Sequence, residues 1–390
     1  MPLGLYLAVP FCRSKCSFCN FASQVHSPRV FSEYCALLVR EIELAAAQGL
    51  EGAAVDTVYW GGGTPSLLAG PDFTAVARAL REHFRVLPGA EHTVEVAPGT
   101  LRPDFLEAML AAGVNRVSLG VQSFVDGEAR AVGRLHDAAV VARDLRQLRA
   151  AGLHDINLDL IAGLPHQTLA SWRSSLEQTL AAEPAHVSVY MLEVDEESRL
   201  GGELLAGGAR YHAHHVPDDD LIADAYLLAC EQLECGGIGQ YEISNFARPG
   251  SESLHNQRYW LRQPYRGFGL DAHSLLAESR FANPDSLAEY LEPLRRGMLP
   301  CSAAAPVTPL AALEETLFLG LRRNAGLTPT RLDECAATVP GFGEWVAPKL
   351  ERLRADGLLT GDQGAWRLSA QGRLLANRVF TEFLGFPASV

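Results

Sequence analysis

Over the first 235 residues, short apolar runs alternate with longer stretches in which apolar residues recur every three or four positions. The apolar runs predict strands at residues 3–10, 55–60, 92–96, 116–121, 155–161 and 186–192. The amphipathic stretches predict helices near residues 30–47, 71–84, 103–112, 138–151, 169–182 and 218–234. A series of strand–helix units predicts a parallel sheet with right-handed crossovers, and nearly continuous apolar strands are typical of a sheet that helices cover.

The number of these units sets the expected fold class. Six strand–helix units are too few for a complete eight-unit barrel, so we expect an α/β fold with a partial, six-unit barrel. In barrels of this kind the chemistry lies at the carboxyl ends of the strands. The barrel motifs described below fall at or near such ends.

A different pattern begins near residue 303, where the proline-bearing run AAAPVTP is typical of a linker. Helical periodicity follows at residues 310–322, 344–356 and 370–384, with short apolar runs at 357–359 and 366–368 between the last two helices. This order predicts a small winged-helix-like α+β unit. We therefore expect a barrel at 1–235, an extension at 236–304 and a C-terminal domain at 305–390.

Composition and charge narrow the functional classes. The 390 residues are 48% hydrophobic and carry a formal net charge of −13, which argues against a nucleic-acid partner, and the C-terminal unit shows no basic recognition helix. The residues before the cysteine motif are too few for a signal peptide, and no apolar run reaches membrane-spanning length. We expect a cytoplasmic protein whose eight cysteines are thiols or metal ligands rather than disulfides.

Three cysteines follow the first predicted strand at once: Cys12, Cys16 and Cys19, spaced C-x3-C-x2-C. Thiolates are the usual ligands of iron–sulfur clusters, and three of them would leave one iron of a cubane open to a small molecule. A zinc knuckle is the alternative, but it needs a second Cys or His pair. The other cysteines are scattered, at Cys35, Cys230, Cys235, Cys301 and Cys335. The spacing therefore favours a 4Fe-4S cluster over zinc.

A glycine-rich turn, GGGTP, spans residues 61–65 directly after the second predicted strand. On its own it could be a tight strand–helix turn or a place where backbone N–H groups approach a ligand. Together with the cysteine array it resembles the radical S-adenosylmethionine (SAM) superfamily. In that family the open iron chelates the amino and carboxylate groups of SAM, and an electron from the reduced cluster cleaves SAM to methionine and a 5′-deoxyadenosyl radical. The resemblance implies that the turn meets the SAM amino group.

Polar residues at the strand ends are candidates for holding a ligand. Glu95 ends the third strand and can accept hydrogen bonds from hydroxyl or ammonium groups, although a solvated strand end is the alternative. Asp159 lies between apolar neighbours and needs a partner, which is either a ligand or Arg134. By resemblance, Arg134 binds the SAM carboxylate, while Ala97 departs from the Asn that is usual there. The implied SAM site comprises Tyr6, Phe18, Gly62, Gly63, Thr64, Glu95, Gln122, Arg134 and Asp159.

A histidine beside two aromatic residues occurs in the run HNQRYW, residues 255–260. Such a set suits a flat macrocycle with an axial imidazole, whereas a packed loop with a capped histidine is the alternative. This run, the preceding YEISNFA and the N-terminal LYLAVPFC are similar to the HemW heme chaperones, in which HNxxYW is associated with heme binding. The resemblance implies that His255, Tyr259 and Trp260 bind heme. Ser253 stands where those proteins often carry Cys.

Two related families share these motifs, the heme chaperones and the oxygen-independent coproporphyrinogen III dehydrogenases. Phe21 stands where the dehydrogenase has a fourth cysteine, and the chain begins at the first strand without the extra N-terminal segment of that enzyme. We therefore expect a chaperone that binds a 4Fe-4S cluster, SAM and heme and passes heme to respiratory heme proteins. The alternative is the dehydrogenase, whose oxidative decarboxylation we expect to be absent, and we assign no catalytic residue. The resemblance also implies an electron donor for the cluster and allows a homodimer and peripheral contact with a membrane.

Overall fold

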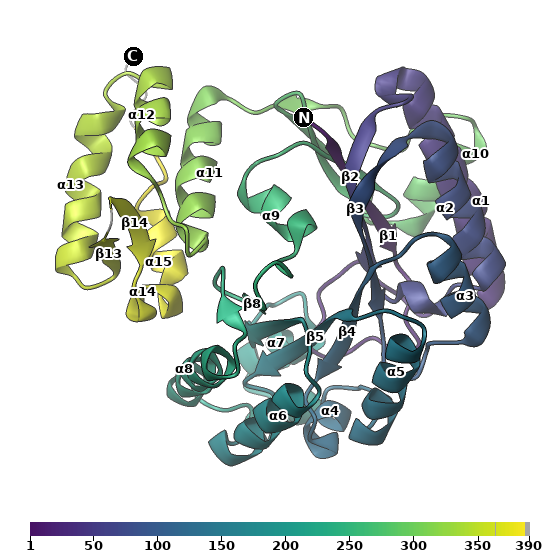
Figure 1. Cartoon of the computed structure of the whole chain (residues 1–390), viewed down its shortest axis with the longest axis horizontal. Helices are drawn as coiled ribbons and strands as arrows, with labels where there is room; N and C mark the ends of the chain where they lie inside the picture. The colour runs from purple at the N-terminus through teal and green to yellow at the C-terminus, as the bar shows by residue number, and fades with distance from the viewer. Residues whose placement is uncertain (363, 387–390) are drawn as a thin grey trace.

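The computed structural model describes residues 1–362 and 364–386, and one large mixed β-sheet lies at its centre (Figure 1). Within the described residues the sheet has twelve strands, and the six that begin the chain run parallel in sequence order. These six are β1 (Leu3–Val9), β2 (Ala54–Gly62), β3 (Arg85–Val96), β4 (Arg116–Gln122), β5 (Asp155–Ala162) and β6 (His186–Met191). The predicted α/β class and six-unit parallel arrangement are confirmed.

Residues after the sixth unit extend both edges of this sheet. At the β6 edge, β8 (Asn245–Ala247) and then β7 (Gly239–Gln240) add as antiparallel strands. At the β1 edge, β9 (Tyr265–Phe268) adds parallel to β1, followed by the antiparallel β10 (His273–Leu276), β11 (Ser279–Ala282) and β12 (Ala305–Pro306). The predicted extension therefore adds strands to both edges of the barrel sheet.

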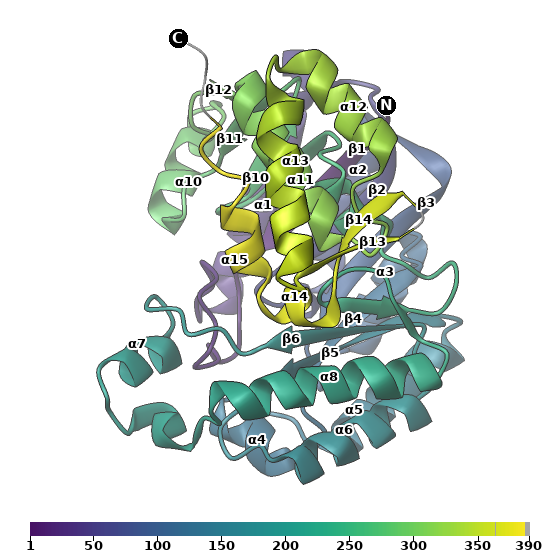
Figure 2. The same ribbon diagram turned by 90° about the vertical axis from the view of Figure 1, so that its left-hand side faces the viewer.

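Helices between the parallel strands cover the outer face of the sheet, as the sequence pattern predicts (Figures 1 and 2). They are α1 (Pro28–Ala45), α2 (Gly70–His83), α3 (Pro103–Ala111), α4 (Asp126–Ala131), α5 (Ala138–Ala150), α6 (Leu169–Ala181) and α8 (Asp219–Cys235). Shorter helical turns are η1 (Ala46–Leu50), η2 (Pro65–Leu67) and η3 (Arg210–His215), and α10 (Leu287–Arg295) packs against α1. Side-chain caps fix several helix starts: Asp137 accepts from the Val140 N–H and Thr168 from the Ser171 N–H.

Two local expectations differ from the structure. The sequence pattern predicts no helix between residues 182 and 218, but the structure has α7 (Arg199–Leu205) there, and Ser198 caps it by accepting from the Gly201 N–H. Strand β3 begins at Arg85, seven residues before the predicted start at His92. Its first part is mostly exposed and pairs with Ala54 and Val55 of β2, so it carries no continuous apolar signal.

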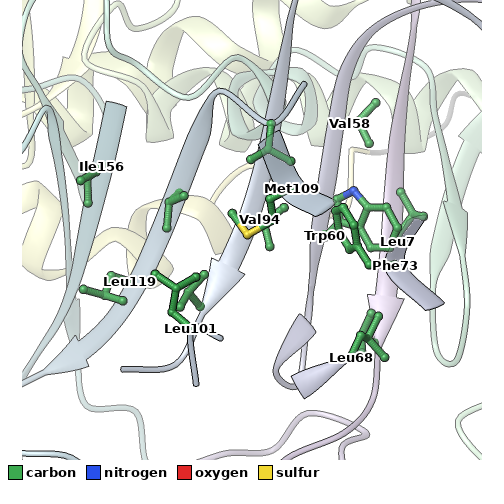
Figure 3. Packing of buried hydrophobic residues seen from close by; sticks show 14 of the residues in the cluster. Leu7, Val58, Trp60, Leu68, Phe73, Val94, Leu101, Met109, Leu119 and Ile156 are labelled. Carbon is green, nitrogen blue, oxygen red and sulfur yellow. The ribbon is translucent and has the colours of Figure 1, made fainter. Parts of the chain in front are cut away.

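The main hydrophobic core lies between the sheet and its helices (Figure 3). Trp60 of β2 is fully buried and packs on Phe73 of α2 with ring centroids 4.2 Å apart. Its indole N–H donates to His92 at 2.8 Å, so the one polar atom of this side chain is satisfied. Each large apolar side chain buried in this way contributes about 1.5–3 kcal/mol. The core therefore holds the strand ends, where the motifs lie, on a rigid support.

The C-terminal unit has a second core, centred on Leu317, Val346 and Val379. Its elements are α11 (Pro309–Arg322), α12 (Pro329–Thr338), α13 (Phe342–Ala355), β13 (Leu359–Asp362), β14 (Ala365–Leu368), α14 (Ala370–Leu374) and α15 (Ala376–Thr381). The prediction of one helix over 370–384 is wrong. Leu375 leaves the helical conformation, with φ −109° and ψ 27°, and separates α14 from α15.

Candidate functional site

A cavity of about 960 Å³ opens at the carboxyl ends of the parallel strands, between the cysteine loop and the C-terminal unit. Its walls come from residues 12–21, from the ends of β2 to β6, and from α14 and α15. Among the residues predicted from the sequence, the structure brings the following to this cavity: Cys12, Cys16, Phe18, Cys19, Gly62, Gly63, Thr64, Glu95, Gln122, Arg134 and Asp159. The position agrees with the rule that barrel chemistry lies at the carboxyl ends of strands.

The cysteine loop is closed by its own backbone. The Cys12 N–H donates to the Gln24 carbonyl at 3.1 Å, and the Gln24 N–H donates to the Pro10 carbonyl at 2.9 Å. Inside the loop, the Cys19 N–H donates to the Cys16 carbonyl at 3.2 Å. Because β1 ends at Val9, buried in the core, the loop starts from a fixed point and presents three thiols to the cavity.

The donors around these thiols fit an iron–sulfur cluster. The Thr64 hydroxyl lies 3.7 Å from Cys12 Sγ, and the Arg134 guanidinium lies 3.6 Å from Cys16 Sγ. Burial raises the pKa of the Cys19 thiol, so the charge of a bound metal would have to ionise it. In the described residues no three His, Cys, Asp or Glu side chains are grouped closely enough for a single metal ion. A cubane places each thiolate on a different iron, and three thiols lining one cavity fit that donor set.

The glycine turn packs directly against the cysteine loop. The Gly63 N–H donates to the Val9 carbonyl at 2.9 Å, and a Cβ at Gly63 would lie 2.7 Å from the Phe11 carbonyl oxygen. Any side chain at Gly63 would therefore push the loop away from the turn. Gly62 has φ +100°, a conformation that L residues rarely adopt. The turn needs glycine because of this close approach and this positive φ, and it also brings the Thr64 hydroxyl to Cys12.

Two of the carboxyl groups that line the cavity, Glu95 and Asp159, lie at the ends of parallel strands. Glu95 accepts from the Tyr59 hydroxyl at 2.9 Å, and Asp159 accepts from the Ser118 hydroxyl at 3.0 Å and from the Asn157 amide at 2.7 Å. Burial raises the pKa of Glu95 to about 8, with Asp159 adding to the rise, and burial also raises the pKa of Asp159. A ligand that brings hydrogen-bond donors or a positive charge would stabilise both in the ionised form.

Arg134 joins the cysteine loop to the strand ends. Besides Cys16, its guanidinium donates to the Gly120 carbonyl, and its Nε is buried without a hydrogen-bond partner. An unpartnered buried donor is consistent with a site for an anionic group. Asp159 accepts hydrogen bonds from Ser118 and Asn157, and among the described residues no ion pair joins it to Arg134, so the direct pair that was the alternative is not formed. Nearby, Gln122 has a positive φ of 68°, an unusual conformation that aims its amide at the cavity.

The predicted heme residues lie outside the cavity, on α9 (Leu254–Trp260), between β2 and α11 (Figure 1). His255 is 1% exposed, its Nδ1 lies 2.9 Å from the Thr57 hydroxyl and its Nε2 lies 2.8 Å from the Tyr259 hydroxyl. Burial lowers the pKa of His255 to about 3, so the ring is neutral at pH 7. Both ring nitrogens are therefore engaged within the protein. Trp260 lies under the Arg322 guanidinium, 4.4 Å from it.

Aromatic stacking connects α9 to the cavity. The ring of Tyr59, which lines the cavity, stacks on His255 with centroids 5.2 Å apart. Tyr6, predicted at the SAM site, lies behind Tyr59 as seen from the cavity. Its ring stacks on Tyr59 with centroids 6.1 Å apart and on His255 with centroids 6.4 Å apart. Since Tyr59 donates to Glu95, the heme motif lies one layer behind this carboxyl group.

Several cavity residues have no signal in the sequence motifs. Tyr59 lies on β2 and Tyr190 on β6. Because side chains alternate between the two faces of a strand, the position of Tyr59 just before the glycine turn could have indicated it. Arg322, Arg373 and Arg378 reach the cavity from the C-terminal unit. More than 160 residues separate them from the barrel motifs, and no local pattern predicts that contact.

Comparison with known proteins identifies the family. Residues 6–178 match the radical SAM superfamily, and residues 307–375 match the HemN C-terminal domain. The heme chaperone HemW of Bacillus subtilis (strain 168) is 33% identical over 383 residues, covering 97% of this chain and 98% of that protein. The chain belongs to the HemW family of radical SAM proteins. The HemW of Escherichia coli (strain K12) is 31% identical over 388 residues, covering 98% of each chain.

A solved structure supports the assignment of the fold. Coproporphyrinogen III oxidase (HemN) from Escherichia coli, a radical SAM enzyme, superposes with a TM-score of 0.85 at 26% identity, covering 98% of this chain and 90% of that one. Membership of the radical SAM superfamily implies a 4Fe-4S cluster and SAM, and the thiols and polar groups of the cavity fit both. In the part of the HemW-family chain that the structure describes, no helix is both long and apolar enough to span a membrane.

Proposed function

We propose that this protein is a heme chaperone that holds a 4Fe-4S cluster and SAM at the barrel mouth and delivers heme to respiratory heme proteins. The observation that carries the proposal is the match to the heme chaperone HemW of Bacillus subtilis over 97% of the chain. That match spans the barrel, the extension and the C-terminal unit alike. The division of the chain at 235 and 304 is part of the same proposal, and the separate core of the C-terminal unit supports its second boundary.

In this proposal Cys12, Cys16 and Cys19 hold the cluster, which when bound supplies an open iron and an electron to SAM. Arg134 binds the SAM carboxylate, a role supported by its unpartnered Nε and by its place beside Cys16. Glu95 accepts from the amino group or the ribose of SAM, which is supported by its burial and by the lack of a cationic partner in the part of the chain that the structure describes. Gly62, Gly63, Thr64, Gln122, Asp159 and Phe18 complete the site, and Tyr6 supports it from behind.

His255 is the proposed axial donor to heme, with Tyr259 and Trp260 beside the macrocycle. In the folded protein Nε2 of His255 is bonded to the Tyr259 hydroxyl, so coordination requires that bond to open. The neutral state of the ring favours coordination, because only an unprotonated nitrogen donates to iron. The proposal therefore includes a local opening of α9 when heme binds.

The remaining proposals concern partners. An electron donor reduces the cluster, and apo forms of respiratory heme proteins accept the heme. The net charge of −13 supports protein partners rather than nucleic acid. We also propose a cytoplasmic location, with a homodimer and peripheral membrane contact as further features of the delivery step.

The test is anaerobic and compares two activities of the same reconstituted protein. Heme-loaded protein is mixed with an apo heme acceptor, and heme transfer is followed by absorbance. In parallel, reduced protein with SAM is incubated with coproporphyrinogen III, and the products are analysed by mass spectrometry. We expect heme transfer and no protoporphyrinogen IX. Decarboxylation without heme transfer would replace the proposal by the dehydrogenase, which the likeness to HemN makes the second candidate.

A further inference from the structure

The wall of the cavity that faces the cysteine loop carries arginines from the C-terminal unit. Arg373 is the fourth residue of α14 and Arg378 the third residue of α15, and both line the cavity. A third arginine, Arg322, also lines the cavity, but it is paired with the buried Glu242 at 2.7 Å.

Neither Arg373 nor Arg378 has a carboxylate partner among the described residues. The Arg373 guanidinium donates to the Leu368 carbonyl at 3.3 Å, and its Nε is buried with no hydrogen-bond partner. Arg378 is exposed to the cavity and makes no side-chain hydrogen bond or ion pair within the described chain. In a protein with 46 acidic residues against 33 basic ones, two unpaired arginines on one cavity wall indicate an anionic ligand.

Several other arginines of the same unit are paired with a carboxylate on the surface. Arg331 lies 2.7 Å from Glu334, and Arg354 lies 2.5 Å from Glu351. These pairs stand on the exposed sides of α12 and α13 and do not line the cavity. Arg373 and Arg378 differ from these two arginines because they line the cavity and have no carboxylate partner among the described residues.

The break at Leu375 brings the two arginines together. Residues five positions apart on a continuous α-helix point about 140° away from each other, because each residue turns the helix by about 100°. At Leu375 the backbone leaves the helical region, with φ −109° and ψ 27°, and both side chains reach the same cavity. The sequence pattern alone predicts a straight helix here, so the double arginine wall exists only because of the break.

We infer that Arg373 and Arg378 bind the two carboxylate side chains of a tetrapyrrole held between the barrel mouth and the C-terminal unit. This inference rests on the proposed function and names the carboxylate subsite of its cargo. The heme motif adjoins this cavity, because the Trp260 ring lies 4.4 Å from the guanidinium of Arg322, which lines the cavity. A volume of about 960 Å³ lies at the upper end of the range for ligand pockets, about 300–1,000 Å³. Apolar side chains beside the arginines, Ile243, Leu374, Leu375 and Phe380, offer contact to a flat ring.

The subsite is separate from the proposed SAM carboxylate site. Arg134 lies 3.6 Å from Cys16 Sγ on the barrel side, whereas Arg373 and Arg378 belong to the opposite wall. Guanidinium groups bind carboxylates through paired hydrogen bonds, so esterifying the ligand carboxylates removes the acceptor charge without changing the macrocycle. This gives a probe that reads the subsite directly.

The experiment titrates heme and heme dimethyl ester into reconstituted full-length protein and follows the Soret band. The variants are Arg373→Gln, Arg378→Gln, the double substitution and Arg378→Lys, with Arg331→Gln as the matched control. We expect the wild type and the control to bind heme at least about tenfold more tightly than the ester. The double variant should lose this preference, Arg378→Lys should keep part of it, and SAM affinity should be unchanged in all variants.

Two results would overturn the inference, and they differ in what else they affect. If the wild type binds heme but the double variant keeps its preference for heme over the ester, the subsite assignment is wrong and the chaperone proposal stands. If the wild type binds neither ligand, the proposed function itself is wrong and the inference falls with it. Circular dichroism and the cluster absorbance of each variant, equal to those of the wild type, establish that the comparison is between folded proteins.

Discussion

At the scale of single residues, Glu95 is a carboxyl group whose ionisation the apo fold opposes. Burial raises its pKa to about 8, so between about pH 4.5 and pH 8 the folded apo protein keeps a proton that the unfolded chain has lost. The stability contributed by this proton is present at low pH and is lost as pH rises toward 8. A ligand that donates hydrogen bonds to Glu95 favours the ionised form and therefore releases the proton when it binds.

We predict that SAM affinity rises with pH up to about 8 and then levels off, by at most about tenfold per pH unit because one proton is released. Isothermal titration calorimetry at pH 6, 7 and 8 measures the slope. Glu95→Gln, which cannot ionise, should give a flat profile over this range. A slope that persists in Glu95→Gln would assign the proton to another group.

The cysteine loop gives a second prediction at this scale. Replacing Cys12, Cys16 or Cys19 with Ala removes one of three proposed ligands and should abolish the reconstituted cluster. Cys35 of α1 is 2% exposed in the hydrophobic core, so Cys35→Ala is a control that removes a thiol away from the cavity. Iron and sulfide analysis should give about four of each per chain in the wild type and in the control. Stoichiometric zinc with no iron would contradict the assignment.

At the scale of elements, α9 is fastened to the barrel by polar contacts at its start. Glu91 of β3 accepts from the Leu254 and His255 N–H groups at 2.8 and 2.9 Å, and Thr57 of β2 bonds the His255 ring. The motif that resembles a heme site is therefore also a structural joint between two strands and a helix. A loss of heme binding in a His255 variant does not by itself identify the iron ligand, because the joint is broken too.

A pair of variants separates these two roles. Tyr259→Phe removes the hydroxyl that occupies Nε2 of His255 at 2.8 Å, while the ring and the packing stay. If His255 coordinates iron, heme should bind more tightly to Tyr259→Phe, by up to about tenfold for one released hydrogen bond. His255→Ala should bind heme weakly with an altered Soret band, and it should also unfold at a lower temperature. An unchanged Soret band in both variants would show that a residue other than His255 is the iron ligand.

At the scale of the whole molecule, ion pairs dock the C-terminal unit on the extension. Glu315 of α11 lies 2.7 Å from Arg262 and 2.8 Å from Arg280, and a second carboxylate, Glu242, is fully buried. Arg322 of α11 lies 2.7 Å from Glu242, which has no exposed surface, and the Asn324 amide donates to the Gln240 carbonyl at 2.7 Å. The same arginine lines the cavity and covers Trp260. The position of the arginine wall relative to the cysteine loop therefore depends on these contacts.

We predict that Arg322→Ala destabilises the docking by about 3 kcal/mol, because it leaves the Glu242 carboxylate buried without its cation. Differential scanning calorimetry should then resolve an earlier transition for the C-terminal unit, and limited proteolysis should cleave between the two cores. Arg331→Ala breaks an exposed pair with Glu334 and should behave like the wild type. A single, unshifted transition in Arg322→Ala would show that other contacts hold the unit.

The sequence by itself determined the parts of the protein whose cause is local. Strand β5 and helix α5 follow from apolar spacing, because the periods of 2 and 3.6 residues are properties of the backbone. The cysteine spacing and the glycine turn indicated the cluster loop, since three thiols and a turn without side chains need little beyond their own neighbours. These elements could be predicted, and so could the arrival of Glu95, Arg134 and Asp159 at one edge of a parallel sheet.

Only the tertiary structure decided which groups meet across long distances in the chain. His255 could be an open ligand or a buried joint, and contacts with Thr57, almost 200 residues earlier, determine that it is buried. Arg373 and Arg378 have no motif, and a backbone break that periodicity does not show turns both toward the cavity. The physical reason is the same in each case. Burial, pairing and pKa depend on neighbours that packing supplies, and packing is settled by the whole chain at once.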